Sequence, residues 1–278
     1  MLVQMRLSAT FRVVRPDRRH MKNLETSLIV FILGSVAAST ALAQPPAKAM
    51  GSPPGWNAAM TRLFGDIKAF TAQAELRVLD KAGKESITVP LSFALLDRRV
   101  RMDIEMTRMK GPQAAPEQIA SLKQMAMDRL TCVILPDRKM MELTFPALRA
   151  YVEMPLPEEE AAALNKNFKT DKTPLGRETI DGHPCAKDRV GLTDDHGQKI
   201  EFIVWSAADL KDFPLQAQLN DGGATVVIRY KNVQFSRPDV KQFEPPSGYT
   251  RHTDIIQLMQ AAAQRQGTNT PKKKRPDR

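Results

Sequence analysis

The sequence predicts an α+β protein that is mainly β, with a large curved antiparallel sheet and short helices over its apolar face. Three observations lead to this fold class. Apolar and polar residues alternate along several consecutive segments, as in strands with one buried face. Turns containing Asp-Gly separate several of these segments and favour tight hairpins. Helical patterns are few and do not alternate with strands, so a parallel βαβ sheet is not predicted.

The first apolar patterns define a helix followed by a three-stranded meander. Trp56, Ala59, Met60 and Phe64 recur with the spacing of an amphipathic helix. The period then changes to two, and it predicts strands over 72–78, 87–95 and 100–106. Pro90 lies on the polar face of the second strand, which favours an edge or a bulge at that position.

The remaining elements continue the same design. Proline and acidic residues in the first turn predict short helices over 116–127 and from 158 onward. Isoleucine, leucine and alanine at helical spacing predict a last helix from Ile255. The further strands are expected at 129–135, 139–145, 147–154, 174–181, 184–193, 198–205, 214–220 and 224–235.

The N-terminal segment has the pattern of a secretory signal. A basic start, an apolar run over 27–43 and the small residues Ala41-Leu42-Ala43 predict cleavage after Ala43, whether Met1 or Met21 is the first residue. The alternative is an uncleaved anchor, but the run falls short of the roughly 20 residues that span a bilayer. The mature protein is therefore expected in the periplasm, with a linker over 44–55, one domain over 56–266 and a disordered basic tail over 267–278.

Composition and charge exclude several classes of protein. The chain has 278 residues, 42% of them hydrophobic, so wholesale disorder is excluded. Its 41 Lys and Arg exceed its 31 Asp and Glu, but six of these basic residues lie in 1–43 and five in the tail. The body is left nearly neutral, which gives no support for a nucleic-acid-binding face.

The two cysteines are expected to form a disulfide. Cys132 and Cys185 would close a loop of 53 residues in an oxidising compartment. Such a loop is worth roughly 4 kcal/mol in the chain-entropy model. The alternative is two separate buried thiols.

Four motifs stand in order in the C-terminal half: Gly176 to Cys185, Trp205 to Leu215, Tyr230 to Val233 and Phe243 to Tyr249. Together they resemble the motifs of LolA/LolB-like periplasmic proteins. The resemblance implies a half-barrel of about eleven strands, whose concave apolar face is covered by helices and receives acyl chains in lipoprotein carriers. An inserted segment around 107–127 and the basic tail depart from that pattern.

Catalysis and metal binding find little support. His183, His196 and His252 belong to no recognisable triad, and the sequence has no nucleophile elbow. No His and Cys spacing fits zinc. No enzyme activity and no cofactor are therefore expected.

Eight methionines gather between residues 102 and 154. Copper ligation would need Met102, Met106 and Met109 to converge, whereas strand geometry separates the first two by about 13 Å. Ordinary core packing is one interpretation. An adaptable apolar surface for lipid chains is the other.

The leading hypothesis is a non-catalytic periplasmic protein that binds a lipid, an acyl chain or a lipidated protein in an apolar cavity. The alternative is an envelope protein-interaction or sensor module with a closed cavity. Nucleic acid is not an expected partner, and the basic tail is expected to touch an anionic membrane surface if it has a function. Strand parity selects the cavity candidates Leu76, Leu91, Phe93, Met102, Ile104, Leu143, Phe202 and Ile228.

Overall fold

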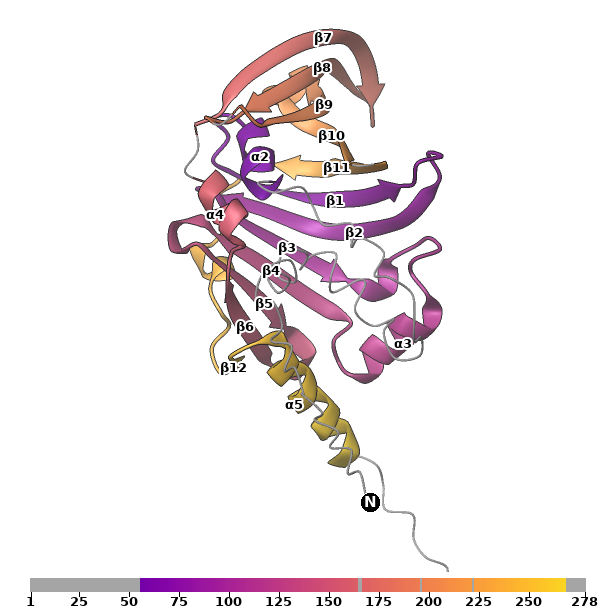
Figure 1. Ribbon diagram of the computed structural model, residues 1–278, viewed down its shortest axis with the longest axis vertical. Coiled ribbons are helices and arrows are strands. Elements are labelled where there is room, and N and C mark those ends of the chain that lie inside the picture. The colour runs from indigo at the N-terminus through magenta and orange to yellow at the C-terminus, as the bar shows by residue number, and fades with distance from the viewer. Residues whose placement is uncertain (1–55, 165–166, 196, 222, 269–278) are drawn as a thin grey trace, which may run out of the picture.

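The computed structural model describes residues 56–164, 167–195, 197–221 and 223–268 (Figure 1). They form one sheet of twelve strands in the order β12-β6-β5-β4-β3-β2-β1-β11-β10-β9-β8-β7. The strands are β1 (Ala69–Leu79), β2 (Glu85–Leu96), β3 (Arg99–Glu105), β4 (Arg129–Leu135), β5 (Met140–Phe145), β6 (Ala150–Pro155), β7 (Lys169–Ile180), β8 (His183–Thr193), β9 (Lys199–Ala207), β10 (Phe213–Asp221), β11 (Ala224–Gln234) and β12 (Thr250–His252).

Two antiparallel meanders make up this sheet. The first runs from β1 to β6 and the second from β7 to β11, and each joins strands that are neighbours in sequence. The pairing of β1 with β11 joins the two meanders, with Leu76 opposite Ile228. The short β12 then adds to β6 in parallel, which the sequence did not predict. The predicted curved antiparallel sheet is confirmed, with one strand more than the resemblance implied.

Helices lie on the concave side of the sheet. Helix α2 (Trp56–Leu63) and helix α4 (Glu158–Ala163) cover one end of the strands, and α3 (Pro116–Gln124) lies at the other end (Figure 1). Helix α5 (Ile255–Thr268) extends from the edge formed by β6 and β12. Among the described residues, no helix is long and apolar enough to cross a membrane.

The predicted position of Pro90 was wrong. Strand β2 lies inside the sheet between β1 and β3, and Pro90 stands opposite Glu75 in unbroken register. The pairing of β2 with β3, however, ends at Leu91 opposite Ile104. Pro90 therefore has no β3 residue opposite it, so a missing N–H is tolerated on that side.

A closing segment, residues 236–252, crosses the outer face of the first meander. Phe243 is buried there with Ala94, Leu96, Val133 and Leu135 in a second, smaller apolar cluster. Ion pairs hold both ends of the segment, one between Arg237 and Asp97 and the other between Arg251 and Glu153. This cover explains why β4 is buried on both faces.

Glu142 lies in β5 on the same outer face and is almost completely buried. One carboxylate oxygen accepts a hydrogen bond from the Thr144 hydroxyl at 2.6 Å, and the other has no hydrogen-bond partner in the described structure. Burial raises the pKa of Glu142; the Thr144 bond opposes the shift and the nearby Glu153 carboxylate adds to it.

Replacing Glu142 by Gln is expected to stabilise the protein at neutral pH by on the order of 1 kcal/mol. A carboxyl group whose pKa is raised by folding stabilises the folded state when it is protonated. This stability is present below pH 4.5, the ordinary pKa, and is lost as the pH rises through the pKa of the folded state. The difference between variant and wild type should therefore shrink below about pH 4.5. Urea unfolding across pH checks this, with exposed Glu117→Gln as the control. A difference that is independent of pH would contradict it.

The predicted disulfide does not form. Cys132 in β4 and Cys185 in β8 are both free and buried. Six strands separate β4 from β8 in the sheet, so the two thiols lie far apart along it. Burial raises the pKa of Cys132 to about 12, and burial also raises the pKa of Cys185. Both thiols are therefore protonated and unreactive at neutral pH.

The predicted leader (1–43), the linker (44–55) and residues 269–278 of the tail lie outside the described residues. Helix α5 continues to Thr268, two residues into the predicted tail.

Candidate functional site

The concave face of the sheet is one continuous apolar surface. All eight residues that strand parity selected lie in a single cluster on this face. Leu91, Phe93, Leu143, Phe202 and Ile228 are buried in it, whereas Leu76, Met102 and Ile104 are only partly buried. The cluster therefore has a packed part and a part that is not fully covered.

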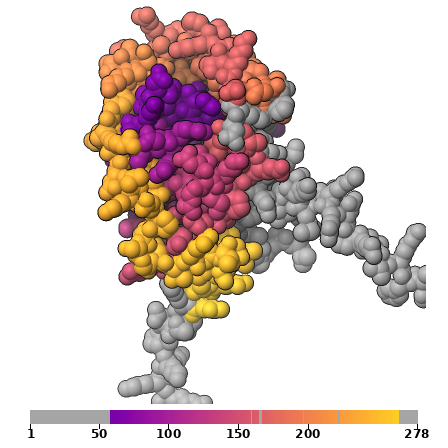
Figure 2. Space-filling view, turned by 90° about the vertical axis from the view of Figure 1, so that its left-hand side faces the viewer, coloured from indigo at the N-terminus to yellow at the C-terminus, as the bar shows by residue number. Residues whose placement is uncertain are grey.

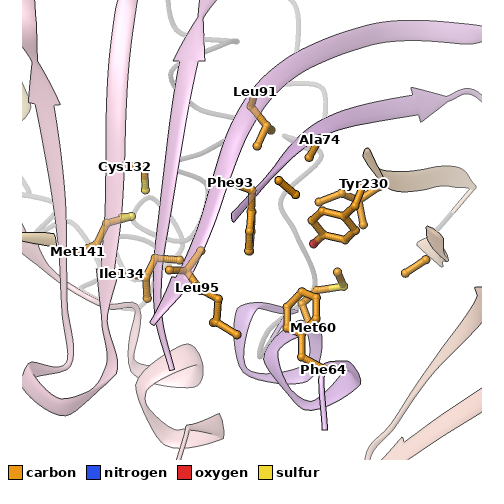
Figure 3. Close-up of a cluster of buried hydrophobic side chains, with 14 of the residues drawn as sticks. Met60, Phe64, Ala74, Leu91, Phe93, Leu95, Cys132, Ile134, Met141 and Tyr230 are labelled. Carbon is orange, nitrogen blue, oxygen red and sulfur yellow. The ribbon is translucent and has the colours of Figure 1, made fainter. Parts of the chain in front are cut away.

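The packed part lies under α2. Figure 3 shows Met60 of this helix and Phe64, which directly follows it, directed toward Phe93 and Tyr230 of the sheet. The Phe64 ring centroid lies 4.9 Å from that of Phe70 and 5.8 Å from that of Tyr230. Phe213 adds a further ring at 5.7 Å. Offset and edge-on contacts of this kind make the region under α2 a close-packed aromatic core.

The Tyr230 hydroxyl is the unusual group in this core. The side chain is 1% exposed, and its oxygen has no hydrogen-bond partner among the described residues. Burial raises the pKa of this phenol well above its ordinary value. The tyrosine is therefore a neutral donor held inside an apolar surface.

The partly covered region will be called the open strip. It runs along the concave side of β1 and β3 toward α3. Its side chains are unbranched or aliphatic, and three of the five are thioethers, which adapt readily to irregular apolar partners. The open strip consists of Leu76, Met102, Ile104, Met109 and Met125.

Of the eight methionines noted in the sequence, Met106, Met127 and Met141 are fully buried core residues. Met102 lies in β3, but Met106 lies just beyond this strand, in the 3-10 turn Met106–Arg108, so the prediction that both methionines share one strand was wrong. The described residues also contain no group of three His, Cys, Asp or Glu side chains that could hold a metal ion.

A buried hydrogen bond fastens α2 to α4. The backbone N–H of Ala58 donates to a carboxylate oxygen of Glu160 at 2.8 Å. Ala58 lies in the first turn of α2, where N–H groups have no acceptor within the helix. Both residues are buried, so Glu160 supplies an acceptor that water cannot replace while the helices stay packed.

Replacing Glu160 by Ala is expected to lower the free energy of unfolding by about 1–3 kcal/mol, because a buried N–H loses its partner. The larger local effect should be faster amide hydrogen exchange across residues 56–63, with β1 and β2 unchanged. Exposed Glu158→Ala in the same helix is the control. Unchanged exchange in α2 would show that this bond does not hold the helix.

The outer face carries a groove of a different character. It has a volume of about 450 Å³ and is lined mainly by alternate, outward residues of β1 to β4, including Glu75, Asp103 and Arg129. Arg129 and Glu105 lie 3.8 Å apart within it. Its mixed charges suit water or polar ligands, and an apolar ligand would be bound better on the concave face.

Of the three histidines noted in the sequence, His183 and His252 are described, and they lie in different strands, β8 and β12. His183 lies 2.7 Å from Asp209 through Nδ1, and nearby Cys185 donates to the His183 carbonyl at 3.4 Å. The Cys185 thiol is buried with a raised pKa, which makes it a poor nucleophile. His252 is in β12, and His196 is outside the described residues.

Comparison with known proteins gives similarity of structure only. No family model matches the chain, and no curated protein matches its sequence. Lipoprotein LppX of Mycobacterium tuberculosis is 10% identical, with 66% of this chain and 96% of that chain covered and a TM-score of 0.35. A LolA superfamily protein, NE2245 of Nitrosomonas europaea, is 12% identical, with 67% of this chain and 96% of that chain covered and a TM-score of 0.32. LprF of Mycobacterium bovis is 11% identical, with 66% of this chain and 97% of that chain covered and a TM-score of 0.32.

The second of these structures carries the name of the superfamily that the C-terminal motifs resemble. At these TM-scores the likeness carries no argument about function. The function therefore has to be argued from the concave face itself.

Proposed function

We propose that this is a non-catalytic periplasmic protein that binds a lipid, an acyl chain or a lipidated protein on the concave face of its sheet. The observation that carries the proposal is the open strip, whose apolar side chains pack against the core of a curved sheet but are only partly buried. Its methionines can repack around a ligand without loss of packing density.

The size of the hydrophobic effect constrains how such a ligand binds. Burying a methylene group is worth about 0.8 kcal/mol, so a half-buried chain of about sixteen carbons gains roughly 6 kcal/mol before any costs. That corresponds to a dissociation constant of about tens of micromolar. A ligand that survives purification must be covered more fully, which requires α2 or α3 to move away from the sheet.

Mass spectrometry of the protein purified from the periplasm without detergent tests the proposal. Native spectra should show extra mass that leaves as lipid. Denatured spectra of the same sample should give a chain that begins at Gln44 and retains the two thiol hydrogens. A chain that is bare after purification, and stays bare when offered lipids or acylated peptides, would contradict lipid binding.

A second candidate function is protein binding at the sheet edge. Strand β7 forms one edge of the sheet, and eleven of its twelve residues are exposed. An unpaired edge offers backbone donors and acceptors to an extended peptide. A bare chain in the native spectra, together with a partner crosslinked to β7, would favour this function over lipid binding.

A further inference from the structure

A row of four side chains crosses the outer face of the first meander, where the closing segment lies. Arg101 of β3 stands opposite Val133 of β4. Val133 in turn stands opposite Glu142 of β5, which stands opposite Glu153 of β6. Residues that pair across antiparallel strands lie on the same face of the sheet. The row therefore places two glutamates side by side on this face, with an arginine two strands away.

The closing segment is attached to this row on both sides of Glu142. On one side, the Arg101 guanidinium donates to the backbone carbonyl of Gln242. On the other side, the Arg251 guanidinium lies 2.9 Å from a carboxylate oxygen of Glu153. Figure 2 shows this part of the chain, in gold, along one side of the molecule. Glu142 is 1% exposed, so its carboxyl group is shielded from water between the two attachments.

The charged groups around this buried carboxyl are each paired with another group. On β3, Arg101 forms an ion pair with Asp103 at 2.6 Å. On β6, Glu153 is paired with Arg251 of β12, and its other oxygen lies 3.1 Å from Arg138, in the turn between β4 and β5. An ionised carboxylate in the middle of the row would therefore have no cation of its own among these groups.

The Glu142 side chain has one oxygen with a partner and one without. The Thr144 hydroxyl donates to the first oxygen at 2.6 Å, and the second has no hydrogen-bond partner among the described residues. A proton on the second oxygen would make it a donor toward Glu153, because side chains paired in this way have Cβ atoms about 5 Å apart. Burial raises the pKa of Glu142, and the Glu153 carboxylate adds to the shift.

We propose that Glu142 and Glu153 bind one proton between them and that this proton holds the closing segment on the sheet. With the proton present, Glu142 donates to Glu153, which keeps its ion pairs with Arg138 and Arg251. When the proton leaves to water, two facing carboxylates repel each other, and detachment of the closing segment lets water reach them. Detachment uncovers the apolar cluster around Phe243 and the edge of β6 that β12 covers. The proton thereby controls access to a sheet edge that can pair with another chain.

A metal ion fits this place less well than a proton. Among the described residues, no three His, Cys, Asp or Glu side chains are grouped so as to hold one. The two arginines beside Glu153 would also repel a further cation. The proposal rests neither on lipid binding at the open strip nor on peptide binding at β7, so its test is separate from theirs.

Amide hydrogen exchange of the purified protein across pH tests the proposal. The reporter is the Thr250 amide, which donates to the Arg149 carbonyl at 2.8 Å and becomes free to exchange when β12 detaches. A proton that stabilises the attached state gives full protection below pH 4.5, the ordinary pKa, and protection is lost as pH rises through the pKa of the attached state. The protection factor, which corrects for the intrinsic effect of pH on exchange, should fall at least about fivefold from about pH 5 to about pH 8. Amides of β1 and β2 should keep their protection, because the opening is local.

Three variants identify the group that binds the proton. Glu142→Gln supplies a permanent donor in its place, so the Thr250 protection factor should stay high and vary by less than about twofold over this range. Two controls should retain the pH dependence of the wild type. Glu244→Gln removes an exposed carboxylate of the closing segment, and His252→Gln removes the other titratable side chain of β12, on the opposite side of that strand from Arg251.

Four results would overturn the proposal. The first is wild-type protection that does not depend on pH. The second is a pH dependence that survives Glu142→Gln or disappears in His252→Gln. The third is an equal loss of protection in β1 and β2, which would indicate global unfolding. The fourth is a change in protection with sodium or potassium at constant pH and ionic strength, which would indicate a metal ion in place of the proton.

Discussion

Replacing Phe64 by Ala is expected to lower the free energy of unfolding by about 3–5 kcal/mol, the usual cost of removing a fully buried aromatic ring. Phe64 directly follows α2 and contacts Phe70, Phe93, Phe213 and Tyr230 together, with ring centroids 4.9 to 6.0 Å away. The cavity left by alanine would be bounded by strands that cannot collapse into it. Urea unfolding followed by circular dichroism measures the loss. A cost below about 1 kcal/mol would show that α2 does not belong to the core.

A second variant in the same aromatic cluster, at Tyr230, is expected to raise the free energy of unfolding. Tyr230→Phe keeps the ring and removes a hydroxyl that has no partner in the described structure. Removing an unsatisfied buried polar group should stabilise the protein by about 1 kcal/mol. A destabilisation would mean that the hydroxyl bonds to a group outside the described residues, such as a bound water or ligand. The two variants together therefore test both the packing and the polarity of the region under α2.

The strands themselves were predictable because their signal is local. Each meander strand has one apolar side, so a period of two in the sequence gave both the strand and the face that is buried. The joining of β1 to β11 was not predictable, because it pairs Leu76 with Ile228 across most of the chain. The same limit explains the cysteines, whose separation in the sheet depends on strand order and not on spacing in the sequence.

The site was predicted in part for the same reason. Parity placed Leu76, Met102 and Ile104 on the concave face, but it contains no information on which residues the helices cover. Phe64 and Tyr230 were missed as partners because one directly follows a helix and the other is on a distant strand. Glu142 was missed because a glutamate in a strand is normally expected on a solvated face, whereas Val133 opposite it is buried with Phe243 of the closing segment, far along the chain. Met109 and Met125 were noted as methionines, but the turns that bring them to the open strip have no periodic pattern.

Replacing Met102 and Ile104 together by Glu is expected to reduce binding of an acyl chain by at least a hundredfold. Both side chains belong to the open strip and lie on successive inward positions of β3. A ligand that covers them would have to desolvate two carboxylates, and each such burial costs several kcal/mol without a paired charge. Because the two residues are only partly covered in the structure, the carboxylates can reach water and the fold should survive.

The control for this double variant adds the same charge elsewhere on the sheet. Ser92→Glu with Gln234→Glu places two carboxylates at exposed strand positions and should leave ligand binding unchanged. Native mass spectra and titration with a fluorescent fatty acid give the bound fraction, and circular dichroism confirms that each variant is folded. If the Met102 and Ile104 double variant loses the ligand and the control keeps it, the ligand binds on the open strip. A folded concave variant that retains its lipid would show that the ligand binds elsewhere, because no acyl chain can lie across two ionised carboxylates without losing most of the hydrophobic free energy that holds it.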